Sequence, residues 1–144
     1  MKKFAFKFEK ILNLRSFAEE EAKLDLARAV SEVSRLENEL ADTIKKRDEV
    51  QKYINNNDPH SVFHVMSYVE RMQYEQRSLE GQIAKANSVV AQRQQVLTEA
   101  IKQRKILSSL KERNLQEYKK EYEKIEVAEL DESNLMRDEL CKVQ

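Results

Sequence analysis

Apolar residues recur at alternating spacings of three and four along most of this 144-residue chain. A spacing that averages 3.5 residues places such side chains in one narrow stripe along an α-helix. The chain has two such stripes, each of fourteen positions. Ten positions are apolar in the first stripe and eleven in the second. The first stripe comprises Phe8, Leu12, Arg15, Glu19, Ala22, Leu26, Ala29, Val33, Leu36, Leu40, Thr43, Arg47, Val50 and Ile54. The second comprises Val62, Val65, Val69, Met72, Gln76, Leu79, Ile83, Ala86, Val90, Arg93, Leu97, Ala100, Arg104 and Leu107.

The one strong turn signal, Asn55-Asn56-Asn57-Asp58-Pro59, lies between the two stripes. Asn tolerates left-handed backbone, Asp caps helices, and Pro suits the first helical position. We therefore predict a helix over residues about 5–55, a turn over about 55–60 and a helix over about 60–140. Matched stripes on the two sides of a turn bury each other as antiparallel neighbours. The predicted fold is all-α: one domain, residues 1–144, formed by a long antiparallel two-helix coiled-coil hairpin.

The two arms of this hairpin are expected to be unequal. Mirror pairing about Asp58 places Phe8 beside Leu107, so the C-terminal helix overhangs from Ser108 to Val143. Such a hairpin offers little concave surface for a small-molecule ligand.

Composition narrows the function classes. The chain contains one Gly and one Pro, which disfavours folds with many turns and excludes glycine-rich phosphate loops. Its 26 basic and 26 acidic residues balance, unlike the basic excess of general nucleic-acid binders and polybasic membrane anchors. A single cysteine, Cys141, and the absence of a signal-peptide or membrane-spanning apolar run predict a soluble cytosolic protein.

Candidate chemistry is sparse. His60 and His64 share a helix face, yet only Asp58 could join them as a metal ligand. The alternative interpretation is that the two histidines are simply polar residues beside the turn. The C-terminal carboxylates alternate with lysines, as on a solvated helix. No Ser-His-Asp arrangement is suggested. We expect no enzyme activity, cofactor or metal.

Two sets of residues exceed what a simple hairpin needs. On the overhang, an apolar and aromatic stripe without an intramolecular partner predicts a binding surface or a self-association surface. Near the turn, Met and aromatic residues are too numerous for one stripe and suggest an adaptable interface, with simple end-packing as the alternative. The overhang stripe is Leu115, Tyr118, Tyr122 and Ile125; the tip set is Tyr53, Phe63, Met66, Tyr68 and Met72.

The two ends of the chain carry recognisable motifs. The opening Phe6-Lys7-Phe8-Glu9-Lys10-Ile11-Leu12-Asn13-Leu14-Arg15, followed by Glu19-Glu20-Glu21-Ala22, resembles the start of the bacterial flagellar export protein FliJ family. The stretches Leu107–Arg113, Glu117-Tyr118 and Glu129-Leu130-Asp131-Glu132 are similar to its late motifs. The middle, from Val50 to Met72, matches only in residue type, so family contacts there do not transfer residue by residue.

This resemblance implies a component of the flagellar type III export apparatus, and so a role in flagellum biogenesis, motility and chemotaxis. It implies three partners: the hexameric export ATPase, which such stalk-like proteins assemble and activate, the cytoplasmic domain of the export-gate membrane protein, and export chaperones. It also implies a cytoplasmic location at the inner membrane of the flagellar base. We expect the arm ends to enter the ATPase ring and the tip set to face another partner. The arm-end set is Phe6, Phe8, Leu12, Arg15, Leu115, Tyr118, Tyr122 and Ile125.

Two alternatives stay open at this point. A scaffolding coiled coil would form a homodimer through the overhang, whereas a stalk would be a monomer until it meets the ATPase. The equivalent stalk of a virulence type III secretion system is a related alternative.

Overall fold

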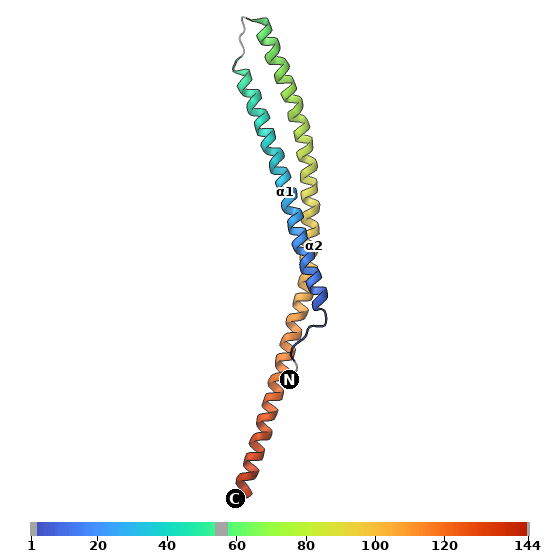
Figure 1. The fold of residues 1–144 in the computed structure, drawn as a ribbon, viewed down its shortest axis with the longest axis vertical. Coiled ribbons are helices and arrows are strands. Elements are labelled where there is room, and N and C mark those ends of the chain that lie inside the picture. Colours follow the sequence, from blue (N-terminus) through green and yellow to red (C-terminus); the bar gives the residue numbers. More distant parts are fainter. Residues whose placement is uncertain (1–2, 54–57, 144) are drawn as a thin grey trace. The chain divides into compact units, whose positions relative to one another are not determined.

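The computed structural model describes residues 3–53 and 58–143, and this part of the chain contains two helices (Figure 1). Helix α1 spans Glu9–Gln51 and helix α2 spans Pro59–Val143. The two helices pack against each other, and the described residues include no strand. The predicted all-α class and the two-helix packing are confirmed.

The turn-side end of α2 is built as its sequence predicts. Pro59 is the first helical residue, and the Asp58 carboxylate accepts a hydrogen bond of 3.0 Å from the backbone N–H of His60. This bond satisfies one of the donors that every helix start leaves free. The preceding helix ends at Gln51, and the predicted turn residues Asn55, Asn56 and Asn57 lie outside the described residues.

Helix α1 begins later than predicted. Residues 3–6 adopt no regular structure, Lys7 and Phe8 form a turn, and the backbone N–H of Glu9 donates to the carbonyl of Phe6 over 3.2 Å. Phe4 and Phe6 are two positions apart, and side chains at that spacing point to different sides of a helix. A non-helical backbone lets both rings contact the protein.

The predicted stripes are the buried faces of the helices. Every described stripe position is buried or half-buried except Arg15 and Arg93; Ile54 lies outside the described residues. Leu36 is 3% exposed. The polar members Glu19 and Thr43 are also buried, at 6% and 8% exposure.

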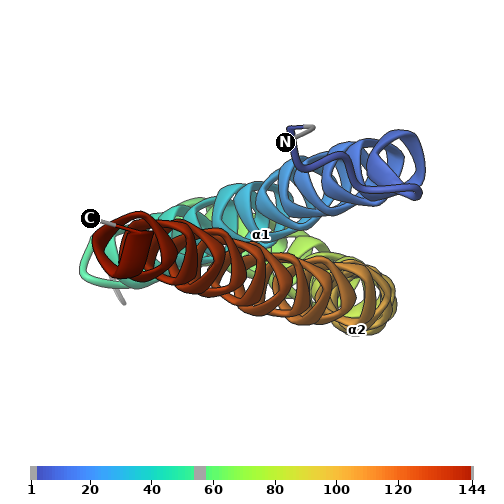
Figure 2. The ribbon, with the colours of Figure 1, turned by 90° about the horizontal axis from the view of Figure 1, so that it is seen from below.

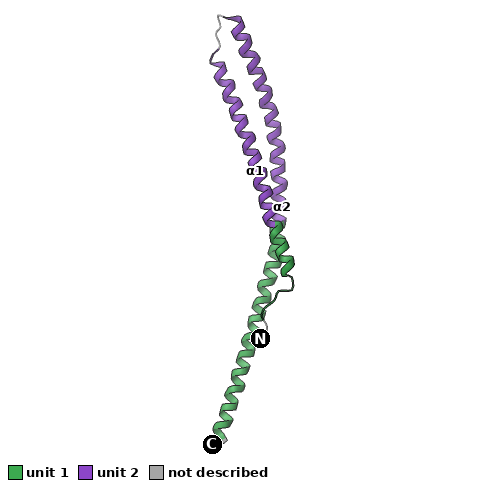
Figure 3. Ribbon diagram, in the orientation of Figure 1, with its two compact units in different colours: residues 1–18, 100–144 green, residues 19–99 purple. Residues whose placement is uncertain are grey.

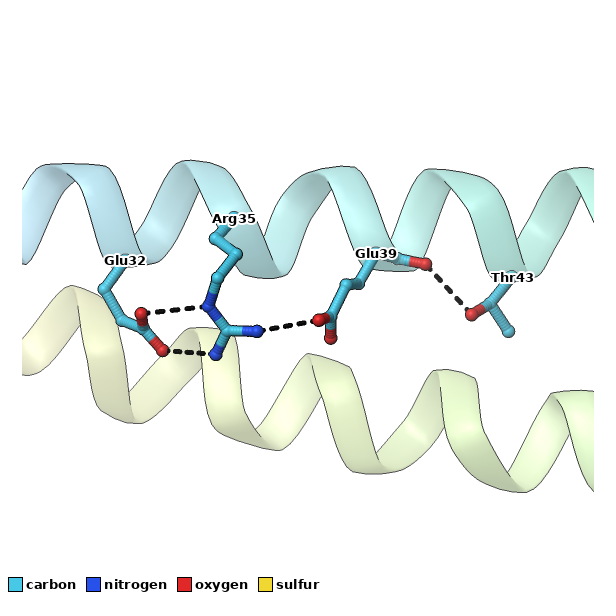
Figure 4. A network of polar contacts seen from close by, with 4 residues as sticks. All are labelled: Glu32, Arg35, Glu39 and Thr43. Carbon is cyan, nitrogen blue, oxygen red and sulfur yellow. Dashed lines mark hydrogen bonds and ion pairs between the residues drawn. The ribbon is translucent and has the colours of Figure 1, made fainter.

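Polar groups in the stripes find partners. The Thr43 hydroxyl donates to the carbonyl of Glu39 at 2.9 Å (Figure 4), and Lys23 lies 3.6 Å from the Glu19 carboxylate. Across the helix pair, the Arg47 guanidinium donates to the Gln76 side-chain oxygen at 2.7 Å. Each of these contacts offsets part of the cost of taking a polar group out of water.

The chain separates into two compact units (Figure 3). Unit 2 comprises residues 19–99, in which α1 runs antiparallel to α2. Unit 1 combines residues 1–18 with residues 100–144. In unit 1 the N-terminal segment, the dark blue trace of Figures 1 and 2, leads into the first turns of α1.

Candidate partner-binding surfaces

All eight residues of the arm-end set belong to unit 1, but they fall into three environments. Phe6 and Leu12 are buried, at 7% and 8% exposure, and form the core of this unit. The ring of Phe6 also meets the ring of Phe8 edge-on, with centroids 5.9 Å apart. A partner therefore cannot reach Phe6 or Leu12 unless unit 1 rearranges.

The prediction that the overhang stripe lacks an intramolecular partner is wrong for its first half. The ring of Phe4 lies 5.6 Å from that of Tyr118, at a tilt of 52°. Leu115 and Tyr118 are both half-buried. The non-helical segment before α1 therefore occupies a face of α2 that the helix pairing alone would leave open.

An ion pair joins α2 to the first residue of α1. The Lys111 ammonium lies 2.9 Å and 3.0 Å from the two oxygens of the Glu9 carboxylate. Both side chains are partly exposed, so the pair adds orientation more than stability. The N-terminal segment is thus held to α2 by a ring contact at one end and a charge contact at the other.

The second half of the stripe is exposed. Tyr122 and Ile125 are 40% and 46% exposed, and Arg15 of the arm-end set is exposed as well. The Glu126 carboxylate, through its charge and a hydrogen bond, raises the pKa of Tyr122, and Glu129 adds to the effect. The environment of this phenol is therefore anionic.

Helix α1 has a second apolar face that was not predicted from the sequence. Ile11, Leu14 and Phe17 are 44%, 68% and 63% exposed and lie on the side of the helix opposite the buried Leu12. Their regular spacing of three is visible in the sequence, but none of the three belongs to the predicted stripe. We call these three residues the outer face of α1.

The tip set lies entirely in unit 2 and contains both exposed and covered residues. Tyr53, Phe63 and Met66 are 79%, 68% and 63% exposed, as an interface requires. Tyr68 is half-buried under the Arg71 guanidinium, which lies 5.6 Å from its ring. Met72 is buried at 7% exposure and serves the helix packing instead of an exterior surface.

Unit 2 is less smooth than predicted. A solvent-open groove of about 410 Å³ runs between α1 and α2, although little concave surface was expected. The lining residues are Glu39, Asp42, Thr43, Lys46, Tyr74, Glu75, Ser78, Leu79 and Gln82. This set contains neither histidine nor cysteine.

His60 and His64 do share a face, with stacked rings whose centroids lie 6.1 Å apart at an interplanar angle of 21°. Asp58, the one further ligand candidate, is engaged as the helix cap. Among residues 3–53 and 58–143, no three histidine, cysteine or acidic side chains gather in a way that could hold a metal ion. In the same part of the chain, neither helix has a stretch long and apolar enough to cross a bilayer.

Comparison with known families gives one match. A family model described as "Flagellar FliJ protein" matches residues 4–138, which is nearly the whole chain. No curated protein and no solved structure matches significantly.

Proposed function

Because the chain belongs to the FliJ family of flagellar proteins, we propose that it acts as a non-catalytic stalk of the flagellar export ATPase. Family membership itself suggests a component of the flagellar export apparatus. The observation that carries the proposal is the extent of the match, which includes both end motifs. A flagellar family favours the flagellar role over the virulence-type one.

The arm-end set is the proposed contact with the ATPase ring. Its accessible members are Arg15, Tyr122 and Ile125, with Tyr118 at the border of the covered region. A cation beside aromatic and aliphatic side chains is a common composition for an interface core. We assign Phe6 and Leu12 the supporting role of fixing α1 against α2.

The tip set is the proposed contact with the export gate or with export chaperones. Tyr53, Phe63 and Met66 supply exposed aromatic and thioether groups, which adapt to more than one partner. A protein with these partners would work in the cytoplasm, at the membrane base of the flagellum. No part of this scheme requires the chain to enter the bilayer.

The experiment is light scattering and a hydrolysis assay on the full chain mixed with the hexamer-forming export ATPase. The expected result is a joint complex with a raised hydrolysis rate. If the chain changes neither the assembly of the ATPase nor its hydrolysis rate, the proposal is overturned and the scaffold alternative is left.

Two double variants test the polarity. Arg15→Ala with Tyr118→Ala is expected to reduce stimulation, whereas Phe63→Ala with Met66→Ala, which changes the tip set, is expected to preserve it. The reverse pattern would show that the tip enters the ring. Circular dichroism of each variant checks that both helices persist.

A further inference from the structure

Within unit 1, helix α1 is apolar on two opposite faces. Leu12 is 8% exposed against α2, while the outer face of Ile11, Leu14 and Phe17 is open to solvent. A helix that is apolar on both faces is normally covered on both. No other residue of described unit 1 covers the outer face, as its exposures show.

Cationic side chains lie before this face and beside it, whereas α1 becomes acidic directly beyond it. Lys7, Lys10 and Arg15 are exposed, and no ion pair links them to a carboxylate within residues 3–53 and 58–143. Residues 1–18 carry five basic residues against one acidic residue, Glu9, which already pairs with Lys111. The surface therefore fits an apolar partner that is rimmed by carboxylates.

The last part of α2 has that composition. Every residue from 121 to 142 is exposed, and this stretch contains eight acidic and three basic residues. Tyr122, Ile125, Met136 and Leu140 lie along one of its sides at helical spacing and are 40–70% exposed. Glu129 lies on the same side, between Ile125 and Met136, and Glu126 lies beside it. The raised pKa of Tyr122 reports their charge.

We propose that a second copy of this chain covers the outer face: the acidic segment 121–142 of one copy packs on Ile11, Leu14 and Phe17 of the other. The contact is reciprocal, so two copies form a closed pair. The apolar residues supply the buried area, and the Lys10 and Arg15 cations face the carboxylates of the partner copy.

The same segment cannot reach the outer face of its own chain. Glu9 contacts Lys111, and α2 continues as one helix to Val143. Tyr122 is eleven residues beyond Lys111, which is about 16 Å along the helix at 1.5 Å per residue. The segment therefore leads away from its own α1.

The charges also argue against the simpler pairing of two overhangs. Two acidic 121–142 segments side by side would repel each other, whereas an acidic 121–142 segment and the basic residues 1–18 attract each other. This inference goes beyond the proposed function. Self-pairing and ATPase binding would compete for one surface, because both contacts use Arg15, Tyr122 and Ile125.

Sedimentation velocity of the full chain over a concentration series is the test. The expected result is a dimer at low ionic strength that weakens as salt screens the charges. Lys10→Glu with Arg15→Glu, and separately Glu126→Lys with Glu129→Lys, are each expected to weaken the dimer by about tenfold or more. An equimolar mixture of these two variants should regain the association through a heterodimer.

Further variants separate this contact from other causes. Leu14→Ser with Phe17→Ser should also lose the dimer, while Lys45→Glu with Lys46→Glu, an exposed pair in unit 2, should keep it. Circular dichroism checks helicity in each case. A chain that is monomeric at every concentration, or charge-reversed variants that do not restore each other, overturns the inference.

Three outcomes distinguish this inference from others. A monomer that binds vesicles of anionic lipid through Leu14 and Phe17 would assign the outer face to a membrane surface and overturn self-pairing. A monomer that still stimulates the ATPase would overturn self-pairing and support the stalk proposal. A dimer that neither binds nor stimulates the ATPase would support self-pairing and overturn the stalk proposal.

Discussion

Phe4 stacks at a tilt on Tyr118, with 5.6 Å between the ring centroids, and so ties the N-terminal segment to the late part of α2. Phe6, two residues on, is 7% exposed. Together these rings place a non-helical segment on a helix that the two-helix pattern alone would leave bare. The opening Phe-x-Phe motif therefore has a structural task in unit 1.

Phe6→Ala is expected to destabilise unit 1 by about 3 kcal/mol, because it removes a buried ring and leaves a cavity. The loss of stability would appear as faster hydrogen exchange of the α2 amides between residues 107 and 118. Phe63→Ala is the matched control, since that ring is 68% exposed and its loss should change little. Unchanged exchange in Phe6→Ala would show that the segment does not stabilise α2.

The periodic part of the fold was predictable from the sequence. The three-and-four spacing identified Glu19 and Thr43 as buried positions despite their polarity, because position on the helix fixes the face. Asp58 and Pro59 marked the start of α2 through local capping chemistry.

The unpredicted features arise from contacts without periodicity. Phe4 reaches Tyr118 through a non-helical backbone that no repeat encodes. The outer face did have a regular spacing, but its three residues cover too short a stretch of the helix to stand out as a second stripe. Met72 was assigned to the tip set by residue type, whereas its stripe position decided its burial.

Gly81→Ala is expected to stabilise the protein by roughly 0.5–1 kcal/mol, because alanine is the better helix former. Gly81 lies in the interior of α2 without a positive φ, and a Cβ added there would meet no atom within 4 Å. Thermal unfolding followed by circular dichroism would show a higher Tm. A lower Tm would mean that Gly81 permits a bend or a close contact that the folded chain requires.

Arg35→Gln tests the surface ion network of α1 (Figure 4). The Arg35 guanidinium donates to Glu32 at 2.6 Å and 3.0 Å and to Glu39 at 2.7 Å. All three side chains are half exposed, so the loss of stability should be small and should shrink further in high salt.

The pH dependence of this network has a definite sign. The hydrogen bond from Arg35 lowers the pKa of Glu32 below its usual value. The stabilisation is therefore complete above the unfolded-state pKa and is lost as the pH falls through the folded-state value. The Tm difference between the native chain and Arg35→Gln should vanish in acid. A difference that persists there would assign the effect to helix propensity.

Tyr122 provides a titration test of its surroundings. The Glu126 carboxylate raises the pKa of its phenol, with a smaller contribution from Glu129, because a nearby negative charge disfavours the phenolate. Glu126→Gln should therefore return the pKa toward its ordinary value. Ultraviolet difference titration measures it, with Tyr122→Phe identifying the signal among the five tyrosines.

Self-pairing should shift the pKa of Tyr122 in the opposite direction, downwards. A second copy would bring Arg15, which stays charged in alkali, towards the Tyr122 face. A cation favours the phenolate, so the pKa of Tyr122 should fall as the protein concentration rises at low ionic strength. The fall should be absent in Arg15→Glu. A pKa that is independent of concentration, while a dimer forms, would place the dimer contact away from segment 121–142.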